Sequence, residues 1–217
     1  MNFKKDIGGF MLALLLVLCS YFFLDAPIAL LVKKVLLSYR RLSLFSSNIP
    51  DLLFPIVCVI TGIAWAAYFY LVHKGIYDRN TRFFKLVAVA VPLAYVLKSL
   101  LKYAVGRINT KYWLRHPNFT EFHWFHGVGN YSGFPSGHMA VFTALVCVLW
   151  KFYPRYRSAY AGFLSVLALT LIATNYHFLS DVVAGAYVGF IVYYYPDQGL
   201  TFWLRSKEKE KTGDIPS

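Results

Sequence analysis

Two residues near the end of the sequence have the types and spacing of a histidine nucleophile and the acid that orients it. His177 and Asp181 are four residues apart, so on a helix the carboxylate lies one turn from the imidazole and accepts a hydrogen bond from it. The other ring nitrogen then keeps its lone pair for attack, as in enzymes that transfer groups. A His-x3-Asp spacing alone is more often structural, so other clusters must support this interpretation.

The segment Pro-Ser-Gly-His at 135–138 adds a candidate anion-binding helix start. Pro135 and Ser136 precede a long apolar run, which is typical of a helix whose first N–H groups are unpaired. Such an end binds anions, Gly137 lets a ligand approach the backbone, and His138 is placed to donate a proton to a leaving oxygen. A capped helix start with a chance histidine is the structural alternative.

A third cluster, KYAVGRINT at 102–110, supplies cations. Lys102 lies near the end of an apolar run, where an ionisable side chain is a candidate functional residue; snorkelling to the interface is the alternative. On a continuous helix Arg107 would point about 140° away from Lys102, at about 100° per residue. A break at Gly106 would turn the guanidinium back toward a phosphate.

The elements that must position these clusters are membrane-spanning helices. Hydrophobic residues make up 58% of the 217 and the mean hydropathy is +0.51, above the usual range for a soluble domain. About 20 apolar residues cross a bilayer, and the candidate spans are 8–24, 52–72, 86–105, 139–152, 158–174 and 179–195. The sequence therefore predicts an all-α integral membrane six-helix bundle: one domain over 1–205 and a polar cytoplasmic tail over 206–217.

The segment after Pro27, IALLVKKVLLSYRRLSLF, has two interpretations. Lys33 and Arg40 are seven residues apart, as are Lys34 and Arg41, so basic side chains share one face of an otherwise apolar helix. This periodicity predicts an amphipathic helix lying in the membrane interface. A continuation of the first span with a charged end is the alternative.

The net charge of +12 indicates a membrane surface as partner and not nucleic acid. The basic residues gather at the ends of the predicted spans, where they meet lipid phosphates. With the amino terminus inside, 13 of the 22 Lys and Arg residues fall on inner segments. The nine on or near the outer side are Lys33, Lys34, Arg40, Arg41, Lys98, Lys102, Arg107, Lys111 and Arg115. The positive-inside rule therefore predicts both termini in the cytoplasm and all three clusters at the outer face.

The order of the three clusters resembles the type 2 phosphatidic acid phosphatase superfamily of membrane lipid phosphatases. The family pattern is Lys-x6-Arg-Pro, then Pro-Ser-Gly-His, then Ser-Arg-x5-His-x3-Asp, spread across a six-helix core, so the resemblance covers nearly the whole chain. It implies that His177 forms a phosphohistidine, Asp181 orients it and His138 protonates the leaving group. It also implies phosphoryl transfer without metal or other cofactor, ended by water. The phosphoryl oxygens would be held by Ser136, Gly137 and Lys102.

Both arginines of the family pattern are missing from this chain. Where the pattern has Arg-Pro and Ser-Arg, the sequence has Asn109, Thr110, Thr170 and Leu171. No neutral side chain gives the paired, charge-assisted hydrogen bonds of a guanidinium. We therefore predict that Arg107 replaces them at the phosphate, with Asn109 adding a neutral hydrogen bond and Arg115 a more distant possibility.

The expected function is that of an integral-membrane lipid phosphatase with its site on the outer (periplasmic) face of a bacterial inner membrane. The substrates implied by the resemblance are isoprenyl diphosphates, phosphatidylglycerol phosphate, phosphatidic acid and the phosphates of lipid A. Two alternatives stay open: a lipid-to-lipid phosphotransferase, and a non-catalytic lipid-binding protein whose site decayed with its arginines. The intact His138, His177 and Asp181 argue against the second alternative. The sequence does not predict the oligomeric state.

Overall fold

Every regular element in the part of the chain that the structure describes is a helix. The structure is a computed structural model, and it describes residues 3–37, 53–116 and 119–212. Its elements are α1 (Phe3–Cys19), the π-helical turn η1 (Ser20–Leu24), α2 (Asp25–Leu37), α3 (Leu53–His73), α4 (Arg79–Val105), α5 (Thr110–Trp113), the 3-10 turn η3 (Gly129–Tyr131), α6 (Gly137–Phe152), the 3-10 turn η4 (Pro154–Tyr156), α7 (Arg157–Ala173) and α8 (Leu179–Thr212). The predicted all-α fold class is confirmed.

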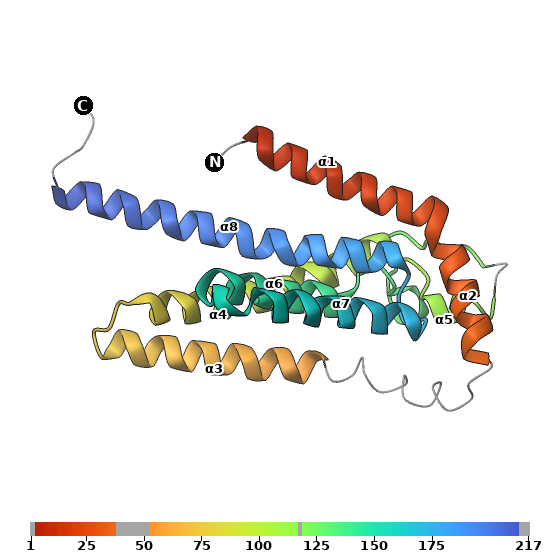
Figure 1. Cartoon of the computed structure of the whole chain (residues 1–217), viewed down its shortest axis with the longest axis horizontal. Coiled ribbons are helices and arrows are strands. Elements are labelled where there is room, and N and C mark those ends of the chain that lie inside the picture. Colours follow the sequence, from red (N-terminus) through yellow and green to blue (C-terminus); the bar gives the residue numbers. More distant parts are fainter. Residues whose placement is uncertain (1–2, 38–52, 117–118, 213–217) are drawn as a thin grey trace.

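The long helices lie side by side, and the chain reverses direction at their ends. In Figure 1 the first turn of α1 and the last turns of α8 lie toward the left-hand end of the molecule, and the links after α4 and α7 lie toward the right. α6 packs against both α4 and α8, and α3 packs against α4. The three clusters of candidate site residues therefore come together at one end of the bundle.

Four helical runs are long and apolar enough to cross a membrane: Asp6–Val35, Pro55–His73, Arg79–Val105 and Pro154–Ala173. They cover four of the six predicted spans. α6 has 16 residues and is about 24 Å long, whereas a bilayer core is about 30 Å thick. α8 contains the sixth predicted span but includes Asp181 and Asp197, and it continues to Thr212, into the predicted tail. The count of six crossings therefore stays a prediction.

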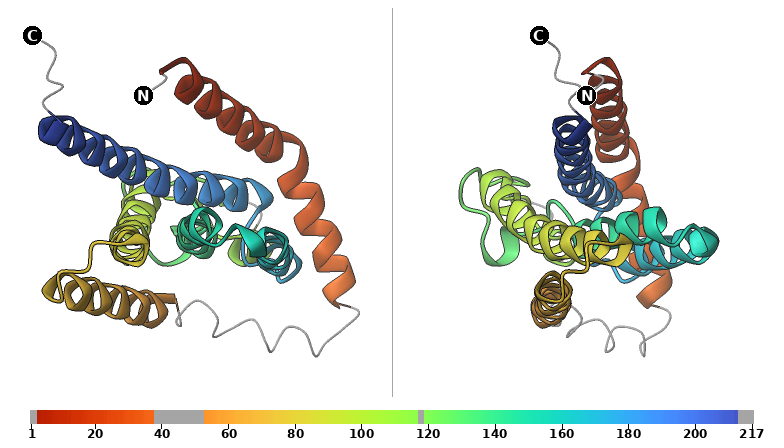
Figure 2. Two further views of the ribbon diagram at one scale, coloured as in Figure 1. Left: turned by 60° about the vertical axis from the view of Figure 1, so that its left-hand side comes forward. Right: turned by 90° about the vertical axis from the view of Figure 1, so that its left-hand side faces the viewer.

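The run Asp6–Val35 bends where η1 joins α1 to α2. The N–H of Asp25 bonds to the carbonyl of Ser20, five residues back, and the helix axis changes direction there (Figures 1 and 2), as expected of a π-turn. In α2, Lys33 donates a hydrogen bond to the Leu114 carbonyl at 2.8 Å. Placement of this segment in the membrane interface stays a prediction, and its Arg40 and Arg41 lie outside the described residues.

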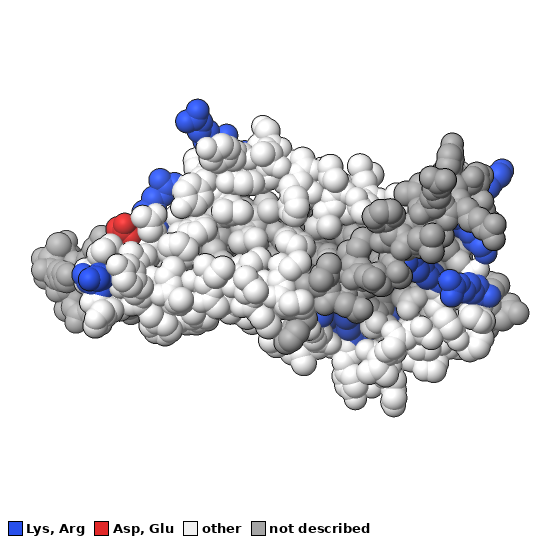
Figure 3. All heavy atoms as spheres, turned by 90° about the horizontal axis from the view of Figure 1, so that it is seen from below, with Lys and Arg blue, Asp and Glu red and all other residues white. Residues whose placement is uncertain are grey.

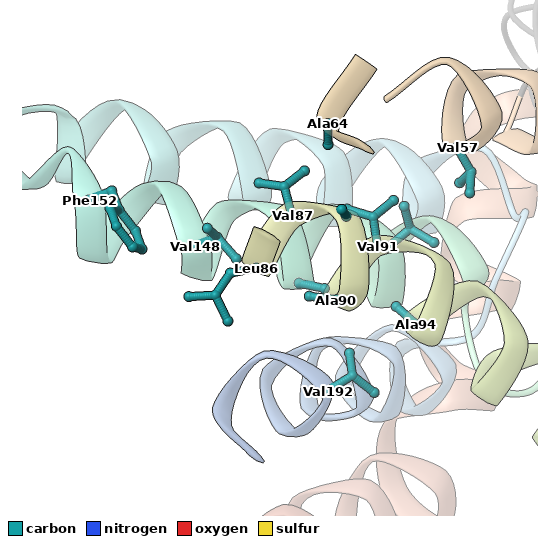
Figure 4. Close-up of a cluster of buried hydrophobic side chains, with 13 residues drawn as sticks. Val57, Ala64, Leu86, Val87, Ala90, Val91, Ala94, Val148, Phe152 and Val192 are labelled. Atoms are coloured by element: carbon teal, nitrogen blue, oxygen red, sulfur yellow. The ribbon is translucent and has the colours of Figure 1, made fainter. Parts of the chain in front are cut away.

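Small and β-branched side chains fill the core between α3, α4, α6 and α8. Figure 4 shows Val87, Ala90 and Val91 of α4 beside Val148 and Phe152 of α6. Alanines at such positions let two helix backbones approach closely, which is how membrane helices pack without a strong hydrophobic driving force. α4 and α6 are thereby held at a fixed spacing beneath the site.

Two glycines on α8 bring it still closer to α6. A Cβ atom added to Gly185 would lie 2.5 Å from the Ser136 carbonyl oxygen, and one added to Gly189 would lie 2.4 Å from that of Ala140. Real Cβ atoms do not approach that closely, so glycine is required at both positions. This seam, Gly185 and Gly189 against the first turns of α6, sets the distance between the starts of the two helices.

The surface suits a molecule embedded in lipid. Figure 3 shows Lys and Arg toward the two ends of the molecule, Asp and Glu at one of them, and an uncharged region between the ends. Large apolar side chains are exposed on the helices, among them Leu16, Phe23, Val166 and Leu169. A contiguous apolar surface of this extent is rare on soluble monomers and common where a protein meets a membrane.

Candidate active site

The structure places the predicted histidine and carboxylate side by side, just beyond hydrogen-bond distance. His177 lies in the link between α7 and α8, and its Nδ1 is 3.6 Å from Oδ2 of Asp181 in the first turn of α8. Both side chains are buried, with exposed fractions of 4% and 0%. Asp181 is fixed by its own helix, because Oδ2 accepts the N–H of Phe178 at 3.0 Å in the manner of a capping box. With Nδ1 facing the carboxylate, Nε2 is the nitrogen left for attack.

His177 also lines a small polar cavity. The cavity has a volume of about 130 Å³ and is lined by Lys102, Asn109, Lys111, Ser132, Tyr176 and His177. Three residues predicted from the sequence, His177, Lys102 and Asn109, therefore surround one space. Lys102 reaches it from the end of α4 and donates a hydrogen bond to the Ser132 carbonyl.

The loop that completes the cavity is held by backbone hydrogen bonds. α4 ends at Gly106, which is left-handed with φ 55°, so the predicted break is confirmed. A Cβ there would lie 1.8 Å from the His123 carbonyl oxygen, which only glycine avoids. The N–H of Asn109 donates to the Asn130 carbonyl at 2.8 Å, and that of Gly133 to the Arg107 carbonyl at 2.8 Å. These bonds join the loop segments 107–109 and 130–133 beside Lys102.

Arg107 does not reach the cavity, and this corrects the prediction that it is a phosphate ligand. Its Nη1 donates to Asp181 Oδ1 at 2.7 Å and to Ser180 Oγ at 2.6 Å, and its Nη2 donates to Asp25 Oδ2 at 2.8 Å. The side chain is 3% exposed, and its carbon Cζ lies 4.3 Å from the Phe178 ring centre. The guanidinium is instead held between two buried carboxylates, those of Asp181 and Asp25.

The Pro-Ser-Gly-His segment begins α6, as predicted. Ser136 is the N-cap, and its Oγ accepts the Met139 N–H at 3.4 Å. Its own N–H donates to the Asp181 carbonyl at 2.9 Å, so the starts of α6 and α8 are tied together. Ser136 and Gly137 are buried and are not among the residues that line the cavity.

His138 contacts the ring of Tyr176 and is not among the residues that line the cavity. It is 7% exposed, and its ring centre is 6.0 Å from that of Tyr176, which in turn is 5.0 Å from that of His177. Tyr176 therefore contacts both histidines. The role of His138 as an acid, like the phosphate-binding roles of Ser136 and Gly137, stays a prediction.

Burial and nearby charges shift the pKa values of the site. Burial lowers the pKa of His177 and the charge of Lys102 lowers it further, while Asp181 opposes them. For Arg107, burial alone would lower the pKa, but Asp181 and Asp25 outweigh it and raise the pKa. The lowered pKa favours the neutral imidazole of His177, and the raised pKa keeps Arg107 charged. Among the described residues, no three His, Cys, Asp or Glu side chains are grouped to hold a metal ion.

Sequence reasoning missed several residues of the site. They are Asp25, Lys111, Ser132, Tyr176 and Ser180. Asp25 carried a signal, because an acid within an apolar run is a candidate functional residue. Ser180 and Tyr176 are chain neighbours of Asp181 and His177, whereas Lys111 of α5 and Ser132 come from the segment that folds back between α4 and α6.

Comparisons with known proteins agree on one family. A family model described as the PAP2 superfamily matches residues 83–207, more than half of the chain. Lipid A 1-phosphatase of Rhizobium etli is 33% identical over 94 residues, which are 43% of this chain and 40% of that protein. Lipid A 1-phosphatase of Rhizobium johnstonii is 33% identical over 94 residues, 43% of this chain and 38% of that protein. The matched region is thus about two fifths of each relative, and no solved structure matches the chain.

Proposed function

Because the chain belongs to the PAP2 superfamily, we propose that it removes a phosphoryl group from a membrane lipid through a phosphohistidine on His177. One observation carries the proposal: the Asp181-oriented His177 and two lysines meet at one small cavity at the end of an apolar helical bundle. A nucleophile beside preorganised cations is what phosphoryl transfer requires, since its catalysis is positioning and charge stabilisation.

The first step forms a bond between His177 and phosphorus. Nε2 attacks, the P–O bond to the lipid breaks, and His138 gives a proton to the leaving oxygen. Asp181 holds the proton on Nδ1 and balances the positive charge that the ring gains. In the second step water attacks phosphorus, the P–N bond breaks, and the proton of the water returns to His138. Inorganic phosphate leaves and the site is restored.

Lys111 is the cation that we assign in place of the missing arginines. It lines the cavity together with Lys102, whereas Arg107 does not. Its amine lies 5.4 Å from the ring centre of Tyr176, the residue next to His177. Two amines about one cavity can hold the oxygens of a phosphoryl group as point charges, without the paired geometry of a guanidinium.

The size of the cavity and the names of the relatives narrow the substrate. About 130 Å³ is well below the roughly 300–1,000 Å³ of pockets that enclose a whole ligand. Only the phosphoryl group would enter, while the lipid chains stay in the membrane. Among the expected substrates, the phosphates of lipid A are favoured because two relatives are named lipid A 1-phosphatase.

The test is release of phosphate by the purified full-length protein in detergent, with a metal chelator present. The panel contains lipid A, phosphatidic acid, phosphatidylglycerol phosphate and an isoprenyl diphosphate. We expect release from at least one lipid, its loss in His177→Ala, and acid-labile label on the protein from a labelled lipid. Lys111→Ala should lower kcat/KM by about 10- to 100-fold, because a hydrogen bond to a charged group is lost, and Lys111→Arg should retain more activity.

The matched control is Lys74→Ala, which removes an exposed lysine from the link after α3, at the opposite end of the bundle. It should leave release unchanged. Transfer of label to another lipid without free phosphate would show the phosphotransferase instead. Absence of both release and transfer from every lipid would refute the enzyme and leave a lipid-binding protein.

A further inference from the structure

Two buried carboxylates share one guanidinium behind His177. Arg107 donates to Asp181 in α8 at 2.7 Å and to Asp25 in α2 at 2.8 Å. Ser180 closes the group, since its N–H donates to Asp25 Oδ1 at 2.9 Å and its hydroxyl donates to Asp25 Oδ2. The exposed fractions of Asp25, Arg107 and Asp181 are 3%, 3% and 0%, so water does not screen the charges.

The charges of this group decide what Asp181 can do for His177. If Arg107 were paired with Asp181 alone, its guanidinium would cancel the negative charge of Asp181. The positively charged ring of His177 would then face a neutral ion pair. With Asp25 present, two carboxylates and one guanidinium carry one net negative charge. That charge matches the positive charge that His177 gains when its nitrogen bonds to phosphorus.

We propose that Asp25 is a positioning residue of this site, which occupies Arg107 so that the Asp181 carboxylate keeps its negative charge for His177. The proposal rests on the proposed phosphohistidine chemistry. Asp25 lies outside the range 83–207 that the family model matches, so the first helical pair adds this function to the matched part of the chain.

Other charged groups face His177 as well and are kept constant in the test. Lys102 of α4 and Lys111 of α5 line the same cavity. His138 of α6 contacts the ring of Tyr176. Asp25 itself bonds to Arg107 and Ser180, so a change at Asp25 acts on His177 through Arg107 and Asp181.

The experiment separates charge from shape. Asp25→Asn keeps the shape and loses the charge, whereas Asp25→Glu keeps the charge and lengthens the side chain. We expect kcat of Asp25→Asn to fall by about 10- to 100-fold, which is the effect typical of residues that orient a functional side chain. The KM should stay within about twofold of the wild-type value. Asp25→Glu should be faster than Asp25→Asn. The double variant Asp25→Asn, Arg107→Gln restores one net negative charge and should regain activity over Asp25→Asn.

A second readout does not depend on activity. Labelled histidine in the detergent-solubilised protein gives an NMR titration of His177, identified among the six histidines by its absence from His177→Ala. The His177 pKa should fall in Asp25→Asn and return toward the wild-type value in the double variant. This holds even if no lipid on the panel is hydrolysed, so failure of the proposed function and failure of this inference are distinguishable.

The control is Asp197→Asn, which removes another buried carboxylate, near the middle of α8, where it is paired with Lys151 at the end of α6. It should change thermal stability without changing the His177 titration or kcat. An Asp25→Asn protein with unchanged titration and kcat would overturn the inference. So would a double variant slower than Asp25→Asn, or an Asp25→Glu slower than Asp25→Asn, because shape and not charge would then decide.

Discussion

The protonation state of His177 determines when it can attack phosphorus. Burial, with the help of Lys102, lowers its pKa below the ordinary value of about 6.5. Attack needs the neutral ring, so activity is present above the lowered pKa and is lost as the pH falls through it. We therefore expect the acid limb of the kcat/KM profile to lie below about pH 6.5.

The comparison that isolates the enzyme uses one lipid and two proteins. The lipid phosphate itself titrates near pH 6, but it contributes equally to both profiles. Lys102→Gln removes a positive charge near His177, so its acid limb should lie at higher pH than that of the wild type, although its rate is lower. If the acid limb of Lys102→Gln stays at the wild-type pH or moves to lower pH, the assignment of that limb to His177 is contradicted.

At this scale the sequence predicted that His177 and Asp181 lie together, whereas the structure places Arg107 outside the cavity lining. His177 precedes α8 and Asp181 lies in its first turn, so the local chain geometry at the helix start is enough to bring them together. The direction of Arg107 depends instead on Asp25, which is 82 residues away. No spacing within the 102–110 cluster contains that partner. An Arg107→Ala variant would leave two buried carboxylates unpaired, at a cost of about 3–5 kcal/mol, and so does not test phosphate binding.

Among the elements, the glycine seam between α6 and α8 is the most sensitive contact. In Gly189→Ala the new Cβ would lie 2.4 Å from the Ala140 carbonyl oxygen and 2.7 Å from the Cβ of Thr143. The helices must separate, and overpacking of this kind costs about 1–3 kcal/mol. Thermal unfolding in detergent should show a lower Tm, and activity should fall because the seam sets the distance from Ser136 to Asp181.

Gly199, on the same helix, gives the matched control. A Cβ there would meet nothing within 4 Å. Gly199→Ala should therefore keep or raise the Tm, because alanine favours a helix over glycine by up to about 1 kcal/mol. Equal Tm values for the two variants would show that α8 is not held against α6 in this way.

The helices themselves were the part of the fold most open to prediction. Among the described residues, each predicted span lies in helical structure to within one residue of its ends, because apolar runs of this length form helices in lipid. η1 was not predicted. Ser20–Leu24 is as apolar as its neighbours, and nothing in its composition indicates that one turn of the helix contains an extra residue. The short α6 and the long α8 also show why counting apolar residues did not confirm six crossings.

For the whole molecule, the open question is which side of the membrane holds the site. The 13-to-9 division of basic residues supports a proposal that the cavity faces outward. Tyr77 in the link after α3 is 76% exposed and Val128 in the loop before α6 is 68% exposed. Cys19, Cys58 and Cys147 are first replaced, and a single cysteine is then placed at one of these two positions. Its accessibility to a reagent shows which side of the membrane that position faces.

A membrane-impermeant maleimide applied to right-side-out vesicles should label Val128→Cys at once and Tyr77→Cys only after the vesicles are opened. Both variants should retain phosphate release, which checks that the fold is unchanged. Immediate labelling of Tyr77→Cys with protection of Val128→Cys would place the site in the cytoplasm.

The π-turn of the first helical run has a consequence for how this site is inherited. One turn of η1 holds one residue more than an α-turn, and Asp25 follows it directly. Deleting a residue between 20 and 24 would rotate everything after it by about 100° and turn Asp25 away from Arg107. The extra residue and the acid are therefore useful only together. Descendants and relatives of this chain should gain or lose them as a pair.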